Sequence, residues 1–210
     1  SSPLSADAVP FERFVKNSIL ARIKMPRSGT VRESLGKVVF RSYEIRGEVA
    51  QTENMCGQQS YLGGLPDRDC DPRYHILRGQ VHDPTASRMN GIAGHAGLFS
   101  TADDLARYCQ MILNGGAVAR QKVKGKRQNP EARILSTQTV ARMTQPYVVS
   151  ETGETRGLGW DMNTSFSANR GELFPLGSFG HTGFTGTGIW IDPTSQTFVV
   201  FLSNRVHPDG

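Results

Sequence analysis

The stretch FGHTGFTGTGIWIDPTSQTFVVFLSN, residues 179–204, has the pattern of an antiparallel sheet. It predicts strands over residues 177–184 and 188–191, and residues 192–196 (DPTSQ) predict the turn that follows. The continuous apolar run over residues 197–202 is typical of a central strand that is covered on both faces. The end of the chain is therefore expected to form a sheet.

The first of these strands carries the candidate functional residues. The polar pair His181-Thr182 is flanked by Gly180 and Gly183. Glycine weakens a strand, and one reason to keep it there is the close approach of a ligand or of another backbone. The pattern alone also fits a strand histidine with a purely structural role.

Residues 91–116 (GIAGHAGLFSTADDLARYCQMILNGG) predict a glycine-rich turn followed by a helix. Ser100 or Thr101 can cap this helix, and Asp103 and Asp104 suit the positive end of its dipole, so we interpret both acids as helix-start residues. The apolar side chains of the helix recur at helical spacing: Leu105, Tyr108, Cys109 and Ile112.

Two other helices are predicted, over residues 10–20 and from the capping Ser136 to Met143. Gly157-Leu158-Gly159-Trp160 is interpreted as a short strand. Between the first helix and residue 80 the chain is poorly periodic, and we expect one short strand within residues 31–43. A loop of such length is usually functional or disordered.

Composition excludes several classes of protein. The chain has 210 residues and a formal net charge of +5. Its one dense basic run, residues 122–127 (KVKGKR), has no aromatic residues between the charges, so we interpret it as a solvated loop and exclude a nucleic-acid partner. No apolar run is long enough to span a membrane.

The three cysteines do not have the spacing of a zinc site, and we expect neither a metal nor a cofactor. Cys56 and Cys70 lie in one glycine- and proline-rich stretch and could pair in an oxidising compartment. Cys109 lies on the predicted helix and is expected to be a buried, small apolar residue.

Four segments together resemble the family of serine beta-lactamases, penicillin-binding proteins and related esterases. These segments are residues 91–116, Gly157-Leu158-Gly159-Trp160, His181-Thr182-Gly183 and the closing hairpin over residues 190–204. The resemblance covers residues 8–30 and 75–208 and implies an α+β fold, in which an antiparallel β-sheet is flanked by helices, with an additional helical part. Residues 1–210 are then expected to be the C-terminal portion of one such domain, incomplete at both ends.

The resemblance also implies the parts of the domain and their chemistry. Residues 31–77 would form an irregular segment at the rim of the cleft, and residues 157–204 would supply the strands that carry the His-Thr-Gly motif. The reaction would be acyl transfer through a serine that is activated by the lysine of a Ser-x-x-Lys motif, with the tyrosine of a Tyr-x-Asn motif as proton shuttle.

The resemblance implies a role for each residue of the third motif. Thr182 would donate a hydrogen bond to a carboxylate or carbonyl of the substrate, and His181 would supply polarity beside it. Gly183 would let the substrate lie close, and the backbone N–H of Phe184 would be one of two oxyanion donors.

The first two family motifs are not credible in this chain. Its single Ser-x-x-Lys runs from Ser34 to Lys37, contains Gly36 and is followed by strand-like residues, and no Tyr-x-Asn occurs. We therefore expect both motifs upstream of Ser1.

Two hypotheses on function follow. The first is a serine acyl-hydrolase that acts on an ester, a β-lactam or a peptidoglycan-type amide, in the periplasm or cell envelope. The second is a non-catalytic module that binds a ligand in the same cleft.

The remaining histidines have weaker interpretations. His75, His82 and His95 are too scattered to predict a metal site. His82-Asp83 follows the irregular segment, so contact with a substrate is one interpretation and a hydrogen-bonded loop histidine is the other.

Overall fold

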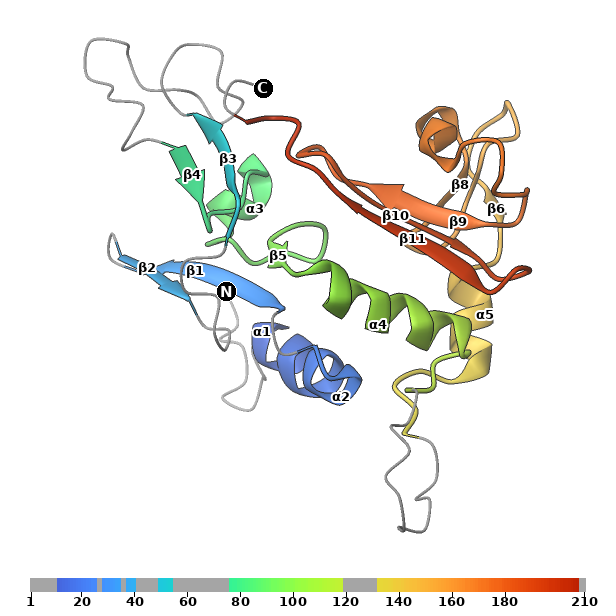
Figure 1. Cartoon of the computed structure of the whole chain (residues 1–210), viewed down its shortest axis with the longest axis horizontal. Coiled ribbons are helices and arrows are strands. Elements are labelled where there is room, and N and C mark those ends of the chain that lie inside the picture. The colour runs from blue at the N-terminus through green and yellow to red at the C-terminus, as the bar shows by residue number, and fades with distance from the viewer. Residues whose placement is uncertain are drawn as a thin grey trace, which may run out of the picture.

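The structure is a computed structural model, and it describes residues 11–25, 28–34, 37–40, 49–54, 76–118 and 132–207. A six-stranded antiparallel sheet lies beside the long helix α4, and two smaller sheets lie at the opposite end of the molecule (Figure 1). This arrangement confirms the predicted α+β class, with an antiparallel sheet and flanking helices.

The helical elements fall into an N-terminal group, a middle group and one helix within the sheet region. They are α1 (Phe11–Phe14), the π-helix η1 (Val15–Leu20), α2 (Ala21–Ile23), α3 (Pro84–Arg88), α4 (Ala102–Leu113), α5 (Thr137–Met143) and the 3-10 helix η3 (Ser165–Arg170).

The strands of the described residues form three separate sheets. They are β1 (Gly29–Ser34), β2 (Lys37–Phe40), β3 (Gln51–Asn54), β4 (Ile76–Arg78), β5 (Leu98–Phe99), β6 (Tyr147–Val148), β7 (Thr155–Arg156), β8 (Asp161–Asn163), β9 (Phe179–Thr182), β10 (Thr187–Asp192) and β11 (Thr197–Leu202). The orders are β2-β1-β5, β3-β4 and β11-β10-β9-β8-β7-β6.

The helix predicted over residues 10–20 is confirmed, because α1, η1 and α2 follow one another without a break. Val15 and Ile19 pack against the core, as the apolar spacing indicates. Phe11 and Phe14, which form the ends of α1, are exposed instead.

Helix α4 begins as the sequence predicts. Thr101 is its N-cap and accepts a hydrogen bond from the backbone N–H of Asp104. The side chain of Asp104 is also engaged, because its buried carboxylate accepts a hydrogen bond from Ser28 Oγ over 2.8 Å. This bond ties α4 to the segment that enters β1.

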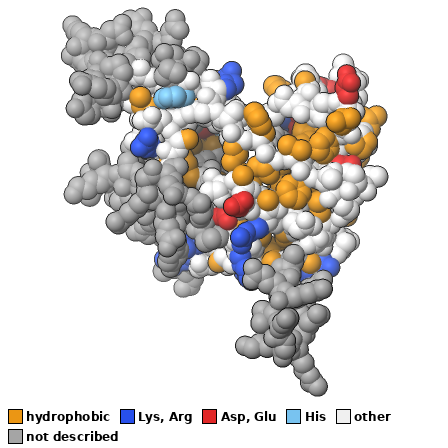
Figure 2. Space-filling view, in the orientation of Figure 1, with side chains coloured by type: hydrophobic (Ala, Val, Ile, Leu, Met, Phe, Trp, Pro, Cys, Tyr) orange, Lys and Arg blue, Asp and Glu red, His pale blue; other side chains and the backbone are white. Residues whose placement is uncertain are grey.

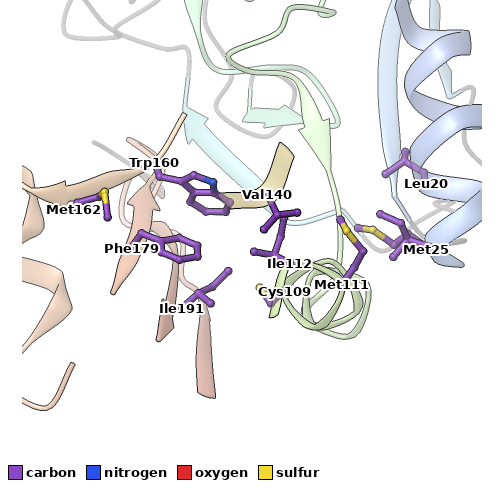
Figure 3. Close-up of a cluster of buried hydrophobic side chains, with 11 residues drawn as sticks. Leu20, Met25, Cys109, Met111, Ile112, Val140, Trp160, Met162, Phe179 and Ile191 are labelled. Carbon is purple, nitrogen blue, oxygen red and sulfur yellow. The ribbon is translucent and has the colours of Figure 1, made fainter. Parts of the chain in front are cut away.

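The core surrounds α4, which packs on the six-stranded sheet on one side and on the N-terminal helices on the other (Figure 3). Its buried side chains come from the N-terminal helices, α4, α5 and the sheet, and they are Leu20, Ile23, Met25, Cys109, Met111, Ile112, Val140, Trp160, Met162, Phe179 and Ile191. Cys109 is buried as predicted, and desolvation raises the pKa of its thiol to about 12, so it is an inert packing residue.

The predicted strand at Gly157-Leu158-Gly159-Trp160 is wrong. These residues form the turn between β7 and β8, in which the N–H of Gly157 donates to the carbonyl of Trp160 over 2.9 Å. Gly159 has φ +78, a left-handed conformation that glycine adopts without strain. Trp160, the apolar residue that suggested a strand, is buried in the core and anchors the turn there.

The strand predicted over residues 197–202 is confirmed as β11. Its central position in the sheet stays a prediction, because we expect its second neighbour to come from upstream of Ser1. Among the described residues, β11 is the edge strand of its sheet, and it pairs with β10 alone. Phe198 and Val200 pack on the core, whereas Val199, Phe201 and Leu202 are exposed. The strand therefore has apolar side chains on both faces, and the described residues cover only one of these faces.

Residues 31–43 hold more regular structure than expected. Part of this range pairs as the hairpin β1–β2, with β1 beginning at Gly29, where one short strand was predicted. The residues Cys56, Cys70 and His75 and the basic run 122–127 lie outside the described residues. Within the described residues, no helix has the length and apolar character needed to cross a membrane.

We expect the 210-residue chain to self-associate through β11, since an exposed apolar edge strand pairs readily with another chain. The variant Phe201→Lys puts a charge on this edge and should shift sedimentation velocity profiles towards the monomer. Leu173→Lys is the matched control, because Leu173 is 97% exposed but lies in a turn. A monomeric unmodified chain, or an equal effect of both variants, would contradict this expectation.

Candidate active site

The His-Thr-Gly motif lies at the end of β9. In the antiparallel register, His181 pairs with Ile189 and Thr182 with Gly188 on β10. Side chains alternate along a strand, so His181 shares the face of the buried Phe179 and Thr182 lies on the opposite face. His181 is exposed and Thr182 is half-buried, so the motif lies where the core ends.

A backbone contact fixes the tautomer of His181. Its Nδ1 lies 2.8 Å from the carbonyl oxygen of Thr182. A carbonyl oxygen only accepts hydrogen bonds, so Nδ1 carries the proton. In the neutral ring Nε2 is then an acceptor, which suits contact with a hydrogen-bond donor.

Close neighbours explain both glycines that flank the motif. At Gly180 one of them is another backbone, as the sequence suggested, because a Cβ there would lie 2.2 Å from the carbonyl oxygen of Ile189. A Cβ on Gly180 would lie 2.1 Å from Cε3 of Trp190. This indole is buried, and its Nε1 donates to Ser178 Oγ over 2.9 Å. A Cβ on Gly183 would lie 2.4 Å from Thr187 Oγ1.

The loop from Gly183 to Gly186 is held by its own strand ends. The N–H of Gly183 donates to the carbonyl of Thr187 over 2.7 Å, and the N–H of Gly186 donates to the carbonyl of Gly183 over 3.0 Å. Phe184, the expected oxyanion donor, lies within this turn.

The segment after β11 holds the same loop from a second side. Arg205 donates from Nε to the carbonyl of Phe184 over 2.8 Å and from its backbone N–H to the carbonyl of Thr185 over 3.0 Å. Its guanidinium also lies 4.6 Å from the centre of the Phe184 ring, a cation–π contact. Sequence reasoning missed Arg205, because no motif marks it.

The segment around β3 and β4 reaches the loop from a third side. His82 Nε2 lies 2.9 Å from Glu53 Oε2, and both side chains are 5% exposed. The His82 ring stacks on the ring of Phe184, with centroids 5.6 Å apart. His82 was singled out in the sequence, whereas nothing in the sequence pointed to Glu53.

Asp83 and His95 have a different role. Asp83 caps α3 by accepting from the N–H of Ala86, and this bond holds the pKa of Asp83 below its ordinary value. His95 Nε2 lies 3.0 Å from the same carboxylate, in an exposed pair. His95 is therefore a hydrogen-bonded loop histidine, as one interpretation of the sequence had it.

A groove of about 960 Å³ runs past the motif. All four candidate site residues, His181, Thr182, Gly183 and Phe184, line it. Arg205 adds positive charge, whereas the charge of Arg156 is balanced by Asp161, whose Oδ1 lies 3.8 Å from Arg156 Nε. Most of the remaining lining is apolar. Figure 2 shows hydrophobic side chains gathered over this part of the molecule, where the six-stranded sheet lies. Concave sites with a few polar groups are typical of ligand binding.

The backbone around Ser34 does not suit a nucleophile of the Ser-x-x-Lys type. Ser34 ends β1 and pairs with Lys37 at the start of β2. In the motif the lysine lies one helical turn after the serine, which this hairpin cannot provide.

Comparison with known proteins gives one family. The model of the protein family described as Beta-lactamase matches residues 5–210. Relatives from Salmonella gallinarum and Salmonella typhi, which carry the provisional name D-alanyl-D-alanine carboxypeptidase, are each 39% identical over 138 residues. The aligned part is 64% of this chain and only 29% of those relatives' length.

Two solved structures also show similarity. A beta-lactamase from Mycobacterium bovis is 26% identical, with a TM-score of 0.36, over 52% of this chain and 38% of that one. A hydrolase with promiscuous acyltransferase activity is 16% identical, with a TM-score of 0.46, over 93% of this chain and 46% of that one.

We expect Gly180→Ala to destabilise the fold, because the new methyl group meets the buried Trp190 ring. Overpacking of this kind costs about 1–3 kcal/mol in free energy of unfolding. Gly188→Ala is the matched control on β10, since its Cβ would meet only the carbonyl of His181 at 3.8 Å. Thermal unfolding of both variants checks this expectation, and equal midpoints would show that Trp190 does not occupy the space above Gly180.

Proposed function

Since the chain belongs to the beta-lactamase family, we propose that it supplies the His-Thr-Gly side of the active site of a serine acyl-hydrolase. The observation that carries the proposal is the end of β9, where His181, Thr182 and the loop of Phe184 line one groove. The nucleophilic serine and its lysine lie upstream of Ser1 in the full-length protein.

Each residue of the motif has a role in the proposed reaction. Thr182 Oγ1 donates to an anionic or carbonyl oxygen of the substrate, and Nε2 of His181 provides a polar contact beside it. Gly183 leaves room for the acyl group. The backbone N–H of Phe184 and that of the nucleophile bind the oxyanion, where one donor typically contributes about 2.7–4 kcal/mol to lowering the barrier.

The substrate that fits best is a peptide ending in D-alanyl-D-alanine, as in peptidoglycan. The names of the Salmonella relatives support this choice, and Arg205 lines the groove with positive charge suited to a terminal carboxylate. The serine oxygen forms a bond to the penultimate carbonyl carbon, and the C–N bond breaks. D-alanine leaves with a proton passed on from the serine, and water hydrolyses the acyl-enzyme. Such a substrate places the protein in the cell envelope or periplasm.

Covalent labelling tests the enzyme against the non-catalytic alternative. We expect a fluorophosphonate or penicillin probe to label the full-length protein stoichiometrically, at a serine upstream of Ser1. The 210-residue chain should stay unlabelled, and Ser34→Ala should not alter labelling of the full-length protein. Labelling of the short chain that Ser34→Ala abolishes would place the nucleophile within it. A folded full-length protein that no probe labels would support the binding module.

The role of Thr182 is tested by Thr182→Val, which keeps the shape and removes the hydroxyl. A lost hydrogen bond costs about 0.5–3 kcal/mol, depending on the charge of its partner. The kcat/KM of the full-length protein for a D-Ala-D-Ala peptide should therefore fall about three- to a hundredfold, with the unfolding midpoint nearly unchanged. Thr152→Val, in the exposed turn between β6 and β7, is the control. Normal kinetics with lost stability would remove Thr182 from the site.

A further inference from the structure

The Glu53–His82 pair is buried, although nothing in the proposed reaction uses it directly. Both side chains are 5% exposed, and Nε2 of His82 lies 2.9 Å from Oε2 of Glu53. Burying a pair of ionisable groups is costly unless its geometry is well satisfied. The pair therefore holds the His82 ring in one position.

That position is against the loop of the His-Thr-Gly motif. The rings of His82 and Phe184 are stacked, with 5.6 Å between centroids and 20° between planes. The carbonyl of Phe184 is held by Arg205 Nε, over 2.8 Å. Two residues from outside the motif therefore hold Phe184: His82 contacts its ring, and Arg205 binds its carbonyl.

A closed ring of contacts joins these residues. Asn204 donates from its side-chain nitrogen to the carbonyl of Gln51, and Nδ1 of His207 lies 3.0 Å from the carbonyl of Thr52. Strand β3, which carries Glu53, is therefore tied to the same segment that supplies Arg205. From β3 the contacts run through His82 and Phe184 to Arg205, and back to β3.

We propose that His82, held by Glu53, is a positioning residue that fixes the backbone N–H of Phe184 as an oxyanion donor. This inference rests on the proposed function. The carbonyl of the Gly183–Phe184 peptide accepts from the N–H of Gly186 over 3.0 Å, and this turn bond is the internal restraint on that peptide. Because a glycine backbone rotates widely, a second restraint from outside the loop narrows the orientation of the peptide further. The stacked ring supplies it, because the ring and the N–H belong to the same residue. An oxyanion donor must lie within about 2.7–3.1 Å of the developing charge, so small rotations matter.

Two variants remove the stacking contact from opposite sides. His82→Gln keeps a donor for Glu53 and loses the aromatic ring. Phe184→Leu loses the partner ring but keeps the backbone N–H, and Phe184 is 55% exposed, so this variant should fold even where His82→Gln does not. Ser28→Ala is the matched control, because it breaks the buried bond to Asp104 away from the loop.

The first readout needs no enzymatic activity. Amide hydrogen exchange of Gly183 and Gly186 in the full-length protein reports opening of the loop, since both N–H groups are hydrogen-bonded within it. We expect exchange to accelerate about tenfold in His82→Gln and in Phe184→Leu, and to stay unchanged in Ser28→Ala. In the double variant His82→Gln/Phe184→Leu, the exchange rate should exceed that of either single variant by less than about threefold, because both substitutions remove the same contact.

The second readout is kinetic. With acetyl-lysyl-D-alanyl-D-alanine and with p-nitrophenyl acetate, kcat should fall about 10- to 100-fold in each variant while KM changes less than about threefold. This loss is smaller than the about 10²–10³-fold loss expected from deleting a donor. Ser28→Ala should lower the unfolding midpoint without changing kcat.

The two proposals fail in different ways. Loop exchange within twofold of the wild type in folded Phe184→Leu overturns the positioning role, whatever the activity. Faster exchange with normal kcat also overturns it. A wild-type full-length protein that hydrolyses neither probe overturns the proposed function instead.

Discussion

The packing of α4 on the six-stranded sheet is the interaction on which the other features depend. Cys109 and Ile112 of α4 are buried in one cluster with Phe179 and Ile191 of the sheet (Figure 3). Burial of such side chains contributes about 1.5–3 kcal/mol each to the free energy of folding. Because Phe179 begins β9, this contact also sets where the His-Thr-Gly motif begins, two residues beyond the core.

The motif is placed by this core, and the loop behind it by contacts distant in the sequence. Arg205, which follows Phe184 in the sequence, binds its carbonyl. His82, which precedes Phe184 by about a hundred residues, stacks on its ring. A buried carboxylate, Glu53, holds His82 in turn. The site is therefore a short strand end whose geometry depends on several segments, which is how preorganised donors are usually maintained.

Local patterns predicted most of the fold and part of the site. Helix α4 with its cap Thr101, the burial of Cys109 and the strand carrying His181 all follow from spacing over a few residues. The GLGW turn was predicted as a strand, because an apolar tryptophan among glycines fits either. The contacts of Glu53 and Arg205 depend on tertiary packing, about which the periodicity of the sequence carries no information.

The central claim is that the backbone N–H of Phe184 binds the oxyanion of a serine acyl-hydrolase. A crystal structure of the full-length protein, acylated by a β-lactam or a D-alanyl peptide analogue, tests it most directly. We expect the acyl carbonyl oxygen within about 2.7–3.1 Å of the Phe184 nitrogen, with Thr182 facing the ligand and the Phe184 ring on His82. An acyl group on a serine remote from β9, with its carbonyl bound by other donors, would contradict the account.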